Sequence, residues 1–285
     1  MAQYLAAHPD IYMAKKEMHV FGSDLHFGPR FYRRDHAEYL AEYATWSGQQ
    51  RAGEASVWYL FSTQAATEMR HFNPESKIII MLREPVEMMY SLYHQFRFDG
   101  NEQLGSFEAA LAAEPDRRAG QYVPRRSYFV QGLAYRDAAR YTDQVRRYFK
   151  VFGRERVQVI TYDDFAADPS RSYEQALEFL GVRANHAPPT FDVVNGNKSI
   201  RSRAIWMLLS DPWLRSMAVA LRHWLPRPVL RLLYRTEARL WALNTRYEKR
   251  PLLSPELRAR LRREFAPEVE RLSQLLGRDL THWSR

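Results

Sequence analysis

Residues 77–91 read Lys-Ile-Ile-Ile-Met-Leu-Arg-Glu-Pro-Val-Glu-Met-Met-Tyr-Ser. The apolar run from Ile78 to Leu82 has the length of a strand, and an unbroken run is typical of a parallel strand covered on both faces. Pro85 suits the first position of a helix, because the N–H that proline lacks has no partner there in any case. Apolar residues then recur at helical spacing, at Val86, Met89, Tyr90 and Tyr93. The segment therefore predicts a buried parallel strand followed directly by a helix.

Two polar residues of this segment are the first candidates for a site. Arg83 follows the predicted strand, and Ser91 comes eight residues later, two turns into the helix. Ligands of open α/β sheets bind at the carboxyl ends of the strands. A guanidinium fork and a hydroxyl together suit a phosphate group. The structural alternative is an ordinary strand–turn–helix in which Arg83 pairs with Glu84 or Glu87.

Composition limits the class of protein. The chain has 285 residues, of which 46% are hydrophobic and 26% charged, as expected of a soluble globular protein with one large domain or two small ones. Cysteine is absent, which excludes disulfides and cysteine-ligated zinc and fits a reducing compartment. The nine histidines show no metal-binding spacing, so we expect no metal. The first residues do not read as a signal peptide, and we expect a cytoplasmic protein.

The charge predicts an anionic partner. The net charge is +9, and such a surface attracts nucleotides, acidic glycans or anionic lipid headgroups. No helix-turn-helix, zinc-finger or RNA-binding signature is present, so we expect no nucleic-acid partner. The segment from about residue 200 to Trp241 mixes tryptophan and leucine with arginine and is too interrupted by charge to span a bilayer. It fits either core-packing helices or a basic amphipathic surface that lies on a membrane.

Strands and helices alternate along the first part of the chain. A second strand is predicted around Val157–Ile160, and a helix is predicted from Asp168-Pro169 to Gly181. This alternation is typical of the α/β class. Pro188-Pro189 marks a boundary, so we expect an α/β core over residues 1–187 and a helical C-terminal part over 188–285. The last predicted helix begins at Ser254-Pro255 and is interrupted by Pro267.

Several segments resemble those of sulfotransferases that use 3′-phosphoadenosine 5′-phosphosulfate (PAPS), in particular the bacterial and heparan-sulfate-type members. Arg-Glu-Pro at 83–85 with Ser91 resembles their 3′-phosphate-binding motif. Three further segments match in family order, over nearly all of the chain: Lys16-Glu17-x-His19-x-Phe21, Gly53-Glu54-x-Ser56 and Tyr162-Asp-Asp-Phe. The resemblance implies a P-loop NTPase-like three-layer α/β sandwich with a central parallel sheet.

The resemblance also implies roles for individual residues. Glu17 would act as general base, with His19 beside it and Lys16 near the sulfuryl oxygens. The cofactor-binding residues would be Arg83 and Ser91 at the 3′-phosphate of PAPS and Lys198 in a loop that closes over it. PAPS would be the co-substrate, no metal would be needed, and the acceptor would be a hydroxyl or amine, most simply on a carbohydrate.

Two departures from the family pattern stand beside these matches. Members begin with a strand and a glycine-rich loop that cradles the 5′-phosphosulfate, whereas this sequence starts inside the helix that should follow that loop. We expect a truncation relative to the family, which would expose a sheet edge. Ala55 stands where some relatives have a lysine. The rival hypothesis is a non-catalytic relative that binds anionic glycan or membrane; a nucleotide kinase lacks support because no Walker-type loop is present.

Overall fold

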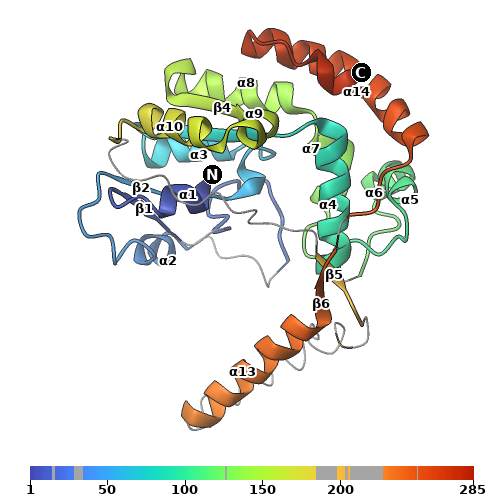
Figure 1. The fold of residues 1–285 in the computed structure, drawn as a ribbon, viewed down its shortest axis with the longest axis horizontal. Coiled ribbons are helices and arrows are strands. Elements are labelled where there is room, and N and C mark those ends of the chain that lie inside the picture. Colours follow the sequence, from blue (N-terminus) through green and yellow to red (C-terminus); the bar gives the residue numbers. More distant parts are fainter. Residues whose placement is uncertain are drawn as a thin grey trace. The chain divides into compact units, whose positions relative to one another are not determined.

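The chain forms two compact units. The larger comprises Met1–Tyr93, Gly100–Asp192 and Leu253–Arg285, and the smaller comprises His94–Asp99 and Val193–Leu252. The computed structural model describes residues 1–14, 17–28, 35–125, 127–183, 198–202, 205, 227–248 and 250–285 (Figure 1). The sequence predicts one boundary at residue 188, whereas in the structure Leu253–Arg285 belongs to the larger unit.

Parallel strand pairs organise the larger unit. Strand β1 (Ile11–Met13) pairs with β2 (Arg51–Gly53), and β3 (Ile78–Leu82) pairs with β4 (Val157–Thr161), both in parallel. The predicted strand over 78–82 is therefore confirmed, and so is the α/β class. Helices of the larger unit are α1 (Ala2–Ala6), α2 (His36–Ala41), α3 (Ala65–Phe72), α4 (Pro85–Asp99, which continues into the smaller unit), α5 (Phe107–Ala112), α6 (Glu114–Arg118), α7 (Tyr135–Ala138), α8 (Tyr141–Phe152), α9 (Tyr162–Ala167), α10 (Pro169–Leu180) and α14 (Pro255–Leu276), with short 3₁₀ turns η1 (Val57–Tyr59), η2 (Gln131–Leu133), η3 (Arg154–Arg156) and η4 (Thr281–Ser284).

The β3–β4 pair is covered on both faces, because successive side chains of a strand point to opposite sides. Ile80 and Leu82 join a buried cluster with α8 and α14, which contact one another (Figure 1). On the other face Ile79 and Ile160 pack in a cluster formed with α1 and α10. These layers carry the predicted helix–sheet–helix arrangement.

Burial of β3 is less complete than its unbroken apolar run predicts. Met81 is 38% exposed, and Ile78 and Ile79 are half-buried. The reason is the size of the sheet: in the part of the chain that the structure describes, β3 has β4 as its partner in a two-stranded sheet.

The amino ends of β2 and β3 meet at the C-terminus of α10. Arg51 Nε donates a hydrogen bond to the carbonyl of Leu180 at 2.7 Å, and Lys77 Nζ donates to that of Phe179. Cations at a helix C-terminus complement its dipole and its free carbonyls. This shared anchor fixes where the two strand pairs begin.

Helix α14 departs from the prediction that Pro267 would interrupt it. It runs unbroken from Pro255 to Leu276 with Pro267 inside. Phe265, Val269 and Leu272 are buried on one face, so packing holds the helix across the hydrogen bond that proline removes. The carboxylate of Glu268 accepts a 2.7 Å bond from the backbone N–H of Thr142, which ties α14 to α8.

In the smaller unit, β5 (Lys198–Ile200) pairs antiparallel with β6 (Thr245–Tyr247), which directly follows α13 (Arg227–Asn244). Asn244 is buried, accepts a bond from the N–H of Ser202 at 2.8 Å, and donates one to its carbonyl at 3.0 Å. The end of α13 is thereby fixed to the hairpin.

Candidate functional site

The first group of candidate residues lies where β3 ends and α4 begins. Glu84 is the N-cap of α4, and its carboxylate accepts a bond from the N–H of Glu87 at 2.8 Å, with Pro85 at the first helical position as predicted. Arg83 therefore projects from the carboxyl end of a buried strand, beside the start of a helix. This is the edge at which α/β folds bind ligands.

The Arg83 guanidinium already has partners. Its Nη2 lies 3.2 Å from Oε2 of Glu87, and it stands 4.9 Å over the ring of Tyr162, at the carboxyl end of β4. The pairing with Glu87 is the structural alternative raised from the sequence. The Arg83 side chain is 33% exposed, so an incoming anion can still reach it.

Cations from α14 surround the same two carboxylates. Arg258 pairs with Oε1 of Glu87 at 2.5 Å, and Arg262 Nε pairs with Oε1 of Glu84 at 3.1 Å. Together with Arg83, three guanidiniums face two carboxylates, which leaves one positive charge in excess. An added phosphate would therefore meet a net attractive field.

Ser91 lies on the same side of α4 as the Arg83 partner. Glu87 and Ser91 are four residues apart in one helix, and such residues stand above one another on its surface. Ser91 is half-buried. Ser91 and Glu87, the partner of Arg83, thus share one side of α4.

The second group of candidates follows β1 and consists of Glu17 and His19. Oε2 of Glu17 lies 3.1 Å from Nε2 of His19, and it also accepts a 3.2 Å bond from the N–H of Val57. The backbone φ of Glu17 is +60° and that of His19 is +46°. Non-glycine residues in the left-handed region cost of order 1–3 kcal/mol each and gather at functional sites. The strain is consistent with a functional role for this pair.

A half-buried carboxylate, that of Glu54 directly after β2, supports the second group. It accepts bonds from the hydroxyl of Tyr59 at 2.7 Å and from that of Ser56 at 3.0 Å. The Ser56 hydroxyl in turn accepts a 3.2 Å bond from the N–H of His19. Burial raises the pKa of Glu54 above its ordinary value, and the bonds from Tyr59 and Ser56 act against that rise.

Glu54 belongs to the segment Gly53-Glu54-x-Ser56 that resembles the family, but the motif alone assigns it no role. The available signal was its place in that segment, directly after Gly53. What could not be predicted is that Tyr59 and Ser56 both aim their hydroxyls at it. Ala55, where some sulfotransferases have a lysine, contributes its backbone: its carbonyl accepts a 3.0 Å bond from the N–H of Glu17.

The His19 ring is held firmly. The residue is 7% exposed, and its ring stacks on that of Phe27 at 4.5 Å and meets the ring of Tyr59 edge-on at 6.2 Å. Its Nδ1 is buried and has no hydrogen-bond partner in the described part of the chain. A buried polar atom without a partner is costly, and it is a natural point of contact for a ligand.

Two further residues that the sequence predicts for the site are Lys16 and Lys198. Lys16 lies outside the described residues. Lys198 begins β5 in the smaller unit, so the structure gives it no position relative to Arg83. Among the described residues, no group of three or more His, Asp or Glu side chains is arranged to hold a metal ion.

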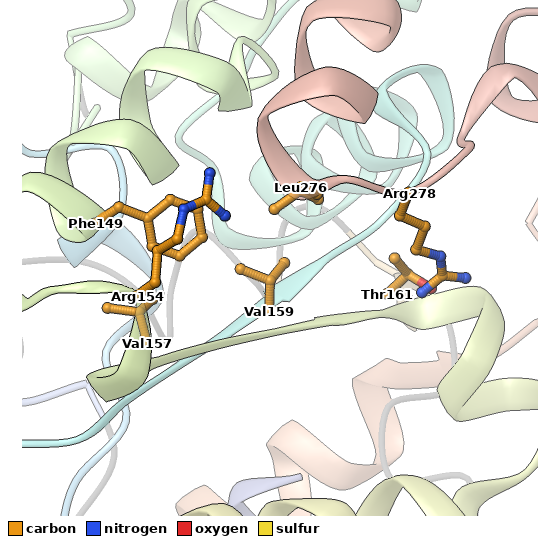
Figure 2. A pocket seen from close by; sticks show the side chains of 7 residues that line it. All are labelled: Phe149, Arg154, Val157, Val159, Thr161, Leu276 and Arg278. Atoms are coloured by element: carbon orange, nitrogen blue, oxygen red, sulfur yellow. The ribbon is translucent and has the colours of Figure 1, made fainter.

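A pocket of about 230 Å³ lies beside β4, lined by Phe149, Arg154, Val157, Val159, Thr161, Leu276 and Arg278 (Figure 2). Its two arginines already have partners. Arg154 donates to the carbonyl of Leu275 at 2.7 Å, and Arg278 Nη2 binds Asp164 at 2.6 Å. None of the candidate site residues lines this pocket, so it is separate from both groups.

Comparisons with known proteins point to one family. A family model described as a sulfotransferase domain matches residues 64–195, which include Arg83 and Ser91. The crystal structure of a sulfotransferase from Alicyclobacillus acidocaldarius is 31% identical, covers 99% of this chain and 92% of that chain, and superimposes with a TM-score of 0.70. The membrane-associated sulfotransferase kil1 of Dictyostelium discoideum is 33% identical over 92 residues, which are 32% of this chain and 19% of that protein.

Proposed function

Because this chain belongs to the PAPS-dependent sulfotransferase family, we propose that it moves a sulfuryl group from PAPS to a hydroxyl or amine acceptor. The observation that carries the proposal is the match to the bacterial sulfotransferase, at 31% identity over 99% of this chain. The fold is the P-loop-like α/β fold expected from the sequence. Catalysis by a transferase is thereby favoured over the rival binding module.

For the donor, we propose that Arg83 and Ser91 hold the 3′-phosphate. Support comes from the position of Arg83 at the carboxyl end of β3 and from the excess positive charge around Glu84 and Glu87. A bound phosphate would take the Arg83 guanidinium from Glu87, which keeps Arg258 as its partner. In our proposal Lys198 adds a further cation to the phosphate.

For the chemistry, we propose that the acceptor oxygen or nitrogen attacks sulfur as its proton passes to Glu17. The bond from sulfur to the phosphate oxygen breaks, and adenosine 3′,5′-bisphosphate leaves. A carboxylate within hydrogen-bond reach is a competent base for such a proton. His19 orients that carboxylate from 3.1 Å, and Lys16 offsets charge on the sulfuryl oxygens.

For the acceptor and the surroundings, we propose a carbohydrate hydroxyl and a cytoplasmic enzyme that contacts a membrane peripherally. The carbohydrate follows from the heparan-sulfate-type motifs of the sequence. The membrane contact has support from the name of the Dictyostelium relative, although the chain spans only about a fifth of that protein.

The test is calorimetric titration with adenosine 3′,5′-bisphosphate. We expect wild type to bind and Arg83→Ala to bind at least about tenfold more weakly, since a charge-assisted bidentate contact is lost. Arg146→Ala is the matched control, because Arg146 lies on the surface of α8 and pairs only with Asp143 among the contacts described. Equal affinity in wild type and Arg83→Ala would remove the 3′-phosphate assignment, and a folded wild type without binding would favour the rival non-catalytic relative.

A further inference from the structure

The net charge of the chain is concentrated in one segment. Residues 193–252 contain twelve Lys and Arg against three Asp and Glu, which gives +9, the net charge of the whole chain. The remaining residues hold thirty of each sign. The same segment contains four of the seven tryptophans. A basic and aromatic composition of this kind is typical of segments that meet an anionic interface.

Helix α13 carries an exposed apolar stripe within this segment (the orange helix of Figure 1). Val229, Leu240 and Leu243 are 40%, 38% and 62% exposed. At about 100° per residue they fall within about 60° of one another around the helix axis, so they form one stripe. Single exposed apolar residues are ordinary, but a row of them along one helix marks an interaction surface.

Arginines border this stripe. Arg235 and Arg239 are exposed, and Arg239 is one residue before Leu240 and four before Leu243. Two like charges at i and i+4 destabilise an isolated helix. A surface of opposite charge would remove that repulsion. The helix therefore combines apolar and cationic side chains in the pattern of helices that lie in a membrane interface.

The stripe stays exposed although the end of the helix is fixed. Asn244 is buried and bonded to Ser202 in both directions, so the last turn is anchored within its own unit. Leu252, in the same unit, is 93% exposed and is the most exposed large hydrophobic residue described. None of the described helices is long and apolar enough to cross a membrane, so any contact through α13 is peripheral.

We propose that α13 docks the chain on an anionic lipid bilayer, with Val229, Leu240 and Leu243 in the acyl region and the arginines at lipid phosphates. This names the element and the lipid chemistry of the membrane contact proposed above, and it does not depend on sulfuryl transfer. A polyanionic glycan would satisfy the arginines but would leave the apolar stripe in water. The stripe and the charge together favour the lipid surface.

The experiment is cosedimentation of the full chain with vesicles of phosphatidylcholine and of an equimolar mixture with phosphatidylglycerol. We expect binding to the anionic vesicles and little to the neutral ones. Arg235→Gln with Arg239→Gln should weaken that binding about thirtyfold. Leu240→Gln with Leu243→Gln keeps the charge and should weaken it at least about tenfold. Matched controls are Leu40→Gln, on the exposed side of α2, and Arg146→Gln.

Three outcomes would overturn the proposal. The first is a folded wild type that does not bind anionic vesicles. The second is unchanged vesicle binding by the leucine variant. The third is that heparin displaces wild type and that variant from vesicles equally well. Either of these two results would show a surface for polyanions instead. Leu243→Gln alone, at the most exposed position of the stripe, replaces the pair if the pair disturbs folding. Binding of adenosine 3′,5′-bisphosphate should stay unchanged in every variant, which separates this result from a failure of the donor site.

Discussion

At the scale of single residues, the two candidate groups differ in how well the sequence predicts them. Arg83, Ser91, Glu17 and His19 belong to sequence motifs, and local pattern suffices to place Arg83 after a strand and Ser91 in the helix that follows. Glu54 is different, because its role depends on the hydroxyls of neighbouring residues that aim at it. The spacing of residues in the sequence does not show toward which group a side chain points. Side-chain direction and burial are settled by packing, which the linear sequence does not contain.

The Glu17 assignment predicts a specific loss of turnover. Glu17→Gln keeps the shape of the side chain but cannot take a proton, so we expect kcat to fall about 10²–10⁴-fold. Affinity for adenosine 3′,5′-bisphosphate should be unchanged, because the proposed donor contacts lie after β3. Steady-state kinetics beside calorimetry would separate the two effects. Unchanged kcat would exclude Glu17 as the base.

The Glu54 network predicts a change in titration. The Tyr59 hydroxyl holds the pKa of Glu54 down against burial, so Tyr59→Phe should raise the pKa of Glu54 further. Carbon-13 NMR of the labelled carboxyl measures this, with Tyr43→Phe as control, whose hydroxyl bonds to Tyr39 instead. Because the pKa of Glu54 is higher in the folded chain than in the unfolded chain, its contribution to the free energy of unfolding is fully present below the unfolded pKa. That contribution is lost as pH rises through the folded pKa. An unmoved pKa in Tyr59→Phe would contradict the network.

At the scale of elements, the junction of β3 and α4 is predictable and its surroundings are not. Five apolar residues and a proline suffice for strand and helix, because both signals are local. The arginines that flank the junction come from α14, about 175 residues later in the chain. Pro267 also shows that local signals are insufficient. A proline normally interrupts a helix, but α14 continues through Pro267 because residues on either side of it are buried.

The ion pairs of Arg258 with Glu87 and of Arg262 with Glu84 form a clamp between α14 and the start of α4. Removing one of its cations should lower stability. Arg262→Ala leaves the carboxylate of Glu84, whose side chain is 7% exposed, without its cation. We expect the free energy of unfolding to fall by about 1–3 kcal/mol in urea denaturation. Arg263→Ala is the matched control, because Arg263 is next in the sequence and its side chain is exposed. Its loss should change the free energy of unfolding by less than about 0.5 kcal/mol. Equal losses in the two variants would rule out the clamp.

At the scale of the whole molecule, acid sensitivity is expected from His94, which lies in α4 where the chain passes from the larger unit to the smaller. Burial, with Arg250 and Arg97 nearby, lowers the pKa of His94 to about 4 from 6.5. The unfolded chain therefore binds a proton that the folded chain does not between these pH values. The free energy of unfolding is therefore undiminished by His94 above pH 6.5 and falls as the pH drops toward 4.

His94→Gln should remove part of this loss. We expect the urea midpoint of wild type to fall more between pH 7 and pH 4.5 than that of the variant. His71→Gln, an exposed residue at the end of α3, serves as control. A variant that declines as steeply as wild type would show that other groups govern acid stability.

The uneven distribution of charge has a practical consequence for handling the protein. The isoelectric point of 9.7 belongs to the whole chain and describes neither unit. Positive and negative charges nearly balance in the larger unit, whereas the smaller unit carries a large excess of positive charge. On a cation exchanger the intact chain would be retained through one short segment. If limited proteolysis released residues 193–252, that fragment would elute late, and residues 1–192 and 253–285, whose charges balance while they stay associated, would elute early. Retention on such a column would then report whether residues 193–252 are still attached.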